Sequence, residues 1–157
     1  MLFRSKANRV LGIDASTASV AFCLFEDGNP IKFGKLPITG NTIYDKIKDA
    51  NTKAKVLSSV CKADYVAVEQ AIMVRSADAG LKIAMIVGAL LSVLLKPETK
   101  VVTVVPVQWQ SFIGNKNFTK AEKLQVEKDF PGKSTNWYKN KIREIRKQRT
   151  MDFFKIG

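Results

Sequence analysis

The sequence predicts an α/β protein built on a mixed β-sheet: a three-stranded antiparallel meander plus parallel strands, with helices on both faces. Two patterns predict this fold class. Near the N-terminus, strand-like segments at about 10–15, 19–25 and 31–36 follow one another across short turns. Helical segments then alternate with short β-branched strands. At 157 residues and 46% hydrophobic, the chain is expected to form a single domain, residues 1–157.

The opening strand ends on Asp14, which is followed by the small residues of a turn. An isolated carboxylate is costly to bury, so we expect Asp14 at the open end of the strand, where a cation or water can reach it. Asp14 is therefore the first candidate for a functional residue. The alternative is that Asp14 only caps the turn through Ser16 and Thr17.

The meander is followed by a helix and by a second acid. Residues 42–61 carry apolar side chains at helical spacing, which predicts an amphipathic helix packed on the sheet. Residues 64–70 form a nearly continuous apolar strand that ends on Glu69. Ligands of open α/β sheets gather at the carboxyl ends of strands, so Asp14 and Glu69 are expected to share one cleft. The alternative for Glu69 is a solvated strand end.

Residues 77–95 predict an apolar helix, followed by a strand at 100–105. One stripe of the helix carries Leu81, Met85, Gly88, Leu91 and Leu95, and the other faces are also largely apolar. We expect it to be buried nearly all round, by the sheet and other helices or by a partner subunit. Its uncharged part, residues 83–95, is shorter than a bilayer span.

The composition changes from Pro106 onward. Residues 106–114 predict a short helix with Trp109 packed inward, and Thr119 begins a helix with Glu122 in the capping-box position. After a break at residues 131–134, a basic helix is predicted at about 136–154. Residues 114–157 thus form a basic insertion or C-terminal region of the domain.

The chain carries a net charge of +12, and the excess is uneven, with twelve Lys or Arg against five Asp or Glu from Lys116 to Lys155. Such a distribution favours a polyanionic partner, and nucleic acid is the usual one. The alternative is a solvated basic surface without a ligand. The candidate nucleic-acid-binding residues are Arg75, Lys116, Lys120, Lys139, Lys141, Arg143, Arg146 and Arg149.

The absence of histidine excludes histidine general bases, Cys-His pairs and His-containing zinc sites. A metal would be held by carboxylates, which favours Mg²⁺ or Mn²⁺. Cys23 and Cys61 fall in apolar segments, as expected for buried thiols in a reducing compartment. With a short basic N-terminus and no secretory apolar core, the protein is expected to be cytoplasmic and without membrane partners.

Two sequence blocks carry a family resemblance. Leu11-Gly12-Ile13-Asp14-Ala15-Ser16 and Val66-Ala67-Val68-Glu69-Gln70, the latter followed by Ser76 to Lys82, resemble the RuvC family of Holliday-junction resolvases. The element order matches the ribonuclease H-like fold of that family. The resemblance covers about residues 10–107, and the small size and basic insertion favour a phage-type member in a host cytoplasm.

The resemblance implies a metal-dependent endodeoxyribonuclease. Asp14 and Glu69 match two of the four carboxylates with which the family holds metal, normally two Mg²⁺ ions (or Mn²⁺) per site. A family lysine supports the scissile phosphate, and it matches either Lys123 or Lys147 here. The implied reaction is paired nicking of four-way or branched DNA by a homodimer formed through the helix at 77–95.

Three departures from the family pattern are present. Members usually end with an acidic pair spaced i, i+3, and nothing after Lys139 provides it. We expect the pair to follow Gly157; the alternative is an incomplete site. Gln110 stands in place of a family lysine, and Ile72 stands where bacterial members often have a base-contacting aromatic. Two alternative functions stay open: a non-catalytic branched-DNA-binding protein of the same fold, and a fragment of an actin-like ATPase or kinase, against which the length argues.

Overall fold

The computed structural model describes residues 8–70 and 76–155. The chain forms two compact units, Met1–Val105 and Pro106–Gly157, and each is described by itself. The division falls at the proline where the composition of the sequence changes. The sequence was expected to form one domain with a basic C-terminal region, and the second unit contains that region.

The first unit contains a five-stranded sheet in the order β3-β2-β1-β4-β5. Strands β1, β2 and β3 form the antiparallel meander, whereas β4 pairs parallel with both β1 and β5. This arrangement confirms the predicted mixed sheet. The strands are β1 (Arg9–Ala15), β2 (Ser19–Glu26), β3 (Asn29–Pro37), β4 (Tyr65–Glu69) and β5 (Lys100–Val104).

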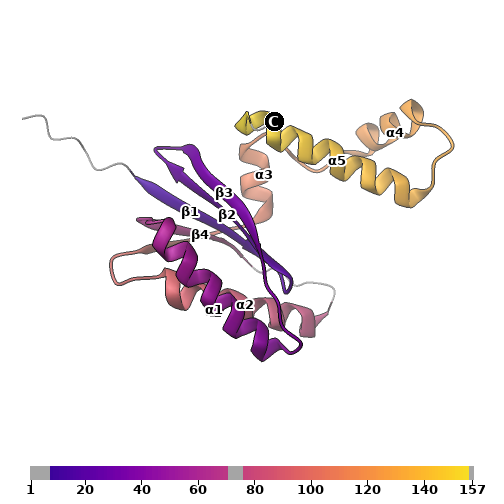
Figure 1. Cartoon of the computed structure of the whole chain (residues 1–157). Helices are drawn as coiled ribbons and strands as arrows, with labels where there is room; N and C mark the ends of the chain where they lie inside the picture. The colour runs from indigo at the N-terminus through magenta and orange to yellow at the C-terminus, as the bar shows by residue number, and fades with distance from the viewer. Residues whose placement is uncertain (1–7, 71–75, 156–157) are drawn as a thin grey trace, which may run out of the picture. The chain divides into compact units, whose positions relative to one another are not determined.

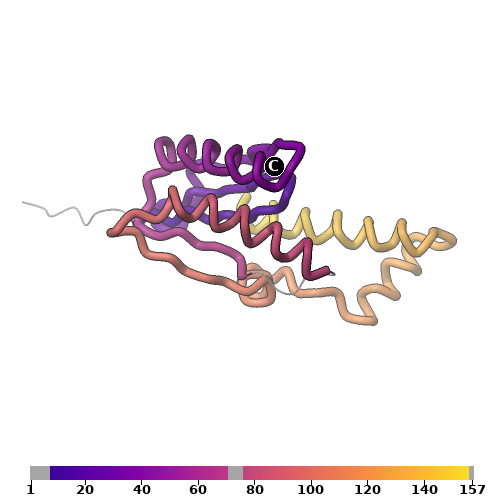
Figure 2. The backbone as a smooth tube through the Cα atoms, turned by 90° about the horizontal axis from the view of Figure 1, so that it is seen from below, coloured from indigo at the N-terminus to yellow at the C-terminus, as the bar shows by residue number. Residues whose placement is uncertain are grey.

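Two helices, α1 (Ile43–Val60) and α2 (Ala77–Leu94), lie side by side on one face of this sheet (Figures 1 and 2). Helix α1 begins at Thr42, whose side chain forms a capping box with Asp45. The core between the helices and the sheet consists of strand residues such as Leu11 and Ile13 and helix residues such as Leu57 and Leu90. These buried side chains fix which face of each strand meets the helices.

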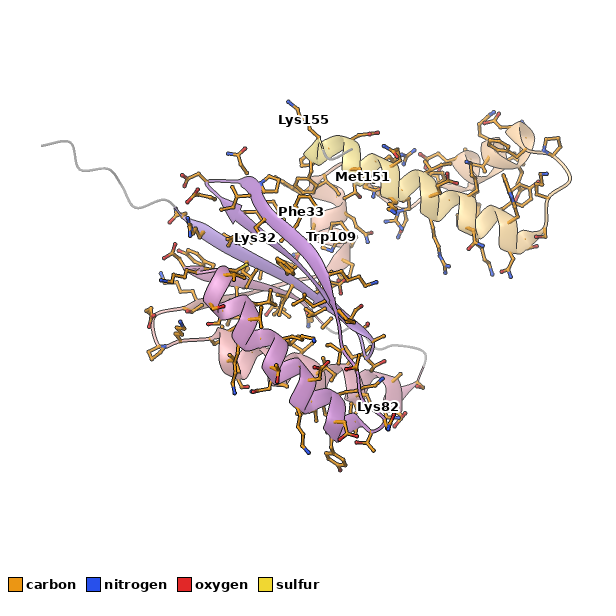
Figure 3. The ribbon with its side chains drawn as sticks, viewed as in Figure 1. Lys32, Phe33, Lys82, Trp109, Met151 and Lys155 are labelled. Carbon is orange, nitrogen blue, oxygen red and sulfur yellow. The ribbon has the colours of Figure 1, made fainter. Side chains whose placement is uncertain are left out.

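Within the described residues of the first unit, the other sheet face carries no helix. On β3, Lys32 donates a hydrogen bond to the carbonyl of Val60 at the end of α1 (3.3 Å), whereas its neighbour Phe33 is 58% exposed (Figure 3). Successive strand residues point to opposite faces. Because Ile13 and Val68 belong to the helix-covered core, the residues that follow them, Asp14 and Glu69, belong to the other face.

Helix α2 is less buried than the sequence predicts. Ile86, Leu90 and Leu94 are buried, but only 17% of the helix is, and Leu81 is 63% exposed. Among the described residues of the first unit, full burial is thus confined to one stripe, beside which residues such as Val87 and Leu91 are half-buried. Burial by a partner subunit stays a prediction. With 18 residues and a mean hydropathy of 1.8, α2 is long and apolar enough to span a membrane, by length and composition only. The expectation that this helix is too short for a bilayer, which counted residues 83–95 alone, was therefore wrong.

The second unit contains α3 (Pro106–Phe112), α4 (Lys120–Asp129) and α5 (Thr135–Phe154). The capping box of Thr119 and Glu122 at the start of α4 is confirmed. Trp109 is 36% exposed, so the prediction that it packs inward was wrong. Helix α3 has only seven residues and buries none of them, and the adjacent Ile113 is buried instead.

Candidate functional site

The structure brings Asp14 and Glu69 together. The parallel ladder between β1 and β4 pairs Gly12 with Ala67 and Ile13 with Val68, and the two acids are the next residues on each strand. Residues at equivalent positions of neighbouring strands present their side chains to the same face. The two carboxylates therefore lie side by side at the carboxyl ends of two adjacent strands, on the sheet face that α1 and α2 leave free.

The two acids differ in exposure. Asp14 is exposed, whereas Glu69 is half-buried. Burial raises the pKa of the Glu69 carboxyl, and the negative charge of Asp14 raises it further. In the part of the chain that the structure describes, no hydrogen-bond donor or cationic side chain is bonded to either carboxylate. The pair thus carries a repulsion that a bound cation would relieve.

The turn after Asp14 does not depend on the aspartate. The hydroxyl oxygen of Ser16 accepts hydrogen bonds from the backbone N–H groups of Ala18 and Ser19, each at 3.1 Å. The backbone N–H of Ser16 also donates to the carbonyl of Ser19 at 2.8 Å. Ser16 therefore stabilises this turn itself, and the interpretation of Asp14 as a turn cap was wrong.

The chemistry of the pair fits a divalent cation of the Mg²⁺ or Mn²⁺ type. Carboxylate oxygens are the protein ligands that such cations prefer, and Mg²⁺ is commonly held by one or two carboxylates together with water and substrate phosphates. Within residues 8–70 and 76–155, no group of three or more His, Cys, Asp or Glu side chains forms a larger site. Asp14 and Glu69 are thus the residues that could hold a cation.

The remaining predicted site residues, apart from Arg75, belong to the second unit. Lys123 and Lys147, the two candidate phosphate-supporting lysines, are exposed on α4 and α5, and Arg75 lies outside the described residues. Of the candidate DNA-binding residues, four are exposed: Lys116, Lys120, Lys139 and Arg143.

Three of the candidate DNA-binding cations are engaged within the second unit: Lys141, Arg149 and Arg146. Lys141 forms an ion pair with Glu144 (3.1 Å) and lies over the Phe130 ring. Arg149 lies over the Phe118 ring, with its guanidinium carbon 4.6 Å from the centroid, and approaches Glu122 to 3.6 Å. These contacts hold the side chains of Lys141 and Arg149 against α4 and the segments that flank it.

A partly buried hydrogen-bond network around Arg146 was not predicted. Arg146 donates from Nη2 to the side-chain oxygen of Gln110 (2.8 Å) and to the carbonyl of Asn115 (3.2 Å). Asn115, only 3% exposed, donates back to the carbonyl of Arg146 (2.8 Å) and to Thr150 (2.9 Å). Gln110 stands at the position where the resemblance to the RuvC family leads one to expect a lysine. Its side-chain oxygen accepts a hydrogen bond from Arg146. A single Asn in a loop gives no periodic signal by which to find such a network.

Comparisons with known proteins address the fold. No family model matches the sequence, and no curated protein does. Among solved structures, RuvC of T. thermophilus in complex with Holliday junction substrate aligns with a TM-score of 0.59 and 15% identity, over 84% of this chain and 87% of RuvC. A second structure of Thermus thermophilus RuvC gives a TM-score of 0.57 and 17% identity, over 76% and 78%.

A third similar structure is the yeast mitochondrial Holliday junction resolvase Ydc2, with a TM-score of 0.51 and 15% identity, over 78% of this chain and 61% of Ydc2. At these identities, the three likenesses establish the fold. This chain therefore has the ribonuclease H-like fold of the RuvC-like Holliday-junction resolvases.

Proposed function

We propose that this protein is a structure-selective DNA endonuclease that cuts four-way or other branched DNA junctions by metal-dependent phosphodiester hydrolysis. The observation that carries the proposal is the side-by-side placement of Asp14 and Glu69 at adjacent strand ends, without a counter-ion among the described residues. The shared fold with resolvases, one of them solved with Holliday junction substrate, and the net charge of +12 support it.

The side chains of the pair have defined roles in this proposal. Asp14 and Glu69 hold the divalent cation, and the exposure of Asp14 leaves the site open to a DNA backbone. The bound cation supplies Lewis-acid chemistry: it polarises the phosphodiester and lowers the pKa of water. Either Lys123 or Lys147 stabilises the negative charge that grows on the phosphate.

The proposal includes a homodimer formed through α2. An 18-residue helix with a mean hydropathy of 1.8 leaves apolar side chains such as Leu81 exposed on this chain. A twofold-symmetric dimer buries the same surface of both copies. It would present two acid pairs to the two opposed strands of a junction, which yields paired nicks.

A second candidate is a non-catalytic protein that binds branched DNA. The observation that favours it is the small number of possible metal ligands. Within the described residues, the site contains two carboxylates and no third metal-ligating side chain. Such a protein would bind junctions through its basic second unit and leave cleavage to another enzyme. The actin-like alternative has no comparable structural support among the described residues.

A nicking assay on a synthetic four-way junction separates the two candidates. With Mg²⁺, we expect the wild type to nick the junction and Asp14→Asn to lose on the order of 10³-fold in rate, because the site loses a ligand charge. Junction binding should be unchanged in the variant. Binding without cleavage by the full-length protein would reject the nuclease.

The matched control for this assay is Asp27→Asn. Asp27 is exposed in the turn between β2 and β3, where its carboxylate accepts a hydrogen bond from the backbone of Asn8 (3.0 Å) and its φ is 49°. Asparagine also accepts this bond and tolerates the left-handed conformation. Asp27→Asn should therefore cleave at the wild-type rate.

A further inference from the structure

A cavity of about 360 Å³ lies within the second unit, between α4 and α5. Helix α4 contributes Lys123, and α5 contributes Lys139, Ile142, Arg143 and Arg146. Phe118, from the segment before α4, adds a second apolar side chain. The cavity thus combines four cationic side chains with apolar walls, and none of the described residues that line it is acidic.

The acids near this cavity are engaged elsewhere. Glu122 accepts hydrogen bonds at the start of α4 and approaches Arg149, and Glu144 pairs with Lys141. Among the described residues, no carboxylate lies within ion-pair distance of Lys123, Lys139 or Arg143. Like charges gathered around a concave surface concentrate a positive potential that attracts anions.

Arg146 is the fourth cation that lines the cavity, and its guanidinium is held in place from within the unit. Its Nη2 is held by Gln110 and Asn115, but its Nε is buried without an acceptor. The planar guanidinium, fixed at one end by the Asn115 network, suits the oxygens of a tetrahedral phosphate.

We propose that this cavity binds a phosphate of a nucleic-acid backbone. The cations contact the phosphate oxygens, and the apolar side chains of Phe118 and Ile142 lie against the adjoining sugar. A free phosphate ion offers the same oxygens, but it has no apolar part for these walls. The inference rests on the proposed function for its ligand, DNA, and adds a binding site built entirely within the second unit.

The test compares two double variants of the full chain. Lys139→Gln/Arg143→Gln removes two exposed cations of the cavity that form no ion pair with the described residues, and it leaves the Arg146 network intact. Lys55→Gln/Lys128→Gln removes two exposed lysines outside it, one on α1 and one on α4. Thermal unfolding followed by circular dichroism should give the same melting temperature for both variants.

The measurement is fluorescence anisotropy of a labelled four-way junction in EDTA, at several salt concentrations. We expect the cavity variant to lower affinity about tenfold or more and to reduce the slope of log K against log [salt] by about 2. The control variant should keep the wild-type slope. An equal loss in both variants would indicate a diffuse basic surface and overturn the proposal.

A second arm distinguishes the source of the phosphate. Melting temperatures of the wild type and the cavity variant are compared in sodium phosphate and in sodium chloride of equal ionic strength. Stabilisation of the wild type alone by phosphate, with equal DNA binding by both proteins, would assign the cavity to a free ion and overturn the proposal. Because EDTA removes divalent cations, these results do not depend on whether the protein cleaves DNA.

Discussion

At the scale of single residues, the central feature is a pair of carboxylates to which no counter-ion is bonded within residues 8–70 and 76–155. Asp14 and Glu69 occupy equivalent positions on parallel strands, so their charges repel. Glu69 is half-buried, and burial together with the charge of Asp14 raises its pKa. A site of this kind destabilises the folded protein until a cation binds, and that cost is typical of functional positions.

This repulsion predicts a pH-dependent effect of Glu69→Gln. Because the folded pKa of Glu69 is raised, the folded state holds this proton more tightly than the unfolded state does. The stabilisation from the protonated carboxyl is complete below the ordinary glutamate pKa and is lost as the pH rises through the raised value. In EDTA at pH 7, Glu69→Gln should therefore melt up to about 4 °C above the wild type.

The difference should disappear below the ordinary glutamate pKa, where both side chains are neutral. Thermal unfolding at several pH values measures it. Addition of Mg²⁺ should stabilise the wild type but not the variant, because a ligand raises the stability only of a state that binds it. Equal melting temperatures for the two proteins at neutral pH in EDTA would refute the repulsion.

At the scale of elements, α2 has an apolar composition that its own chain does not use fully. Ile86, Leu90 and Leu94 pack in the core, whereas Leu81 is exposed. A helix that is apolar on several faces is usually buried on several faces. Its exposed surface is therefore the expected interface of the proposed dimer.

Leu81→Glu tests this interface. A charge in an apolar interface loses hydration without gaining a partner, so the variant should be monomeric at concentrations where the wild type is a dimer. Sedimentation velocity measures the difference. Val56→Glu, which places the same charge at a 50% exposed apolar position of α1, should stay dimeric. A monomeric wild type would contradict the dimer.

At the scale of the whole molecule, the two units carry different chemistry. The first contains the mixed sheet and the acid pair, and the second holds the region with twelve Lys or Arg against five Asp or Glu. In the proposed function, the first unit cuts the phosphodiester and the second binds backbone phosphates. Affinity for DNA is then expected to fall steeply with salt.

Features of the fold and the site that follow from short sequence patterns could be predicted, whereas those that depend on contacts between distant residues could not. The strands, the capping box at Thr119 and the proximity of Asp14 to Glu69 follow from short patterns and from the rule that parallel strands end at one edge. The contact of Arg146 with Gln110 joins residues 36 positions apart, and no short pattern encodes it. The exposure of Trp109 and Leu81 likewise depends on tertiary packing.

The claim that Asp14 and Glu69 jointly hold a divalent cation is tested most directly by calorimetric titration of Mn²⁺ into the metal-free protein. The wild type and Asp27→Asn should bind Mn²⁺ with equal affinity. Asp14→Asn and Glu69→Gln should each lose at least about tenfold in affinity, because each removes a ligand. Mn²⁺ binding of equal strength in the wild type and in both of these variants would contradict the claim.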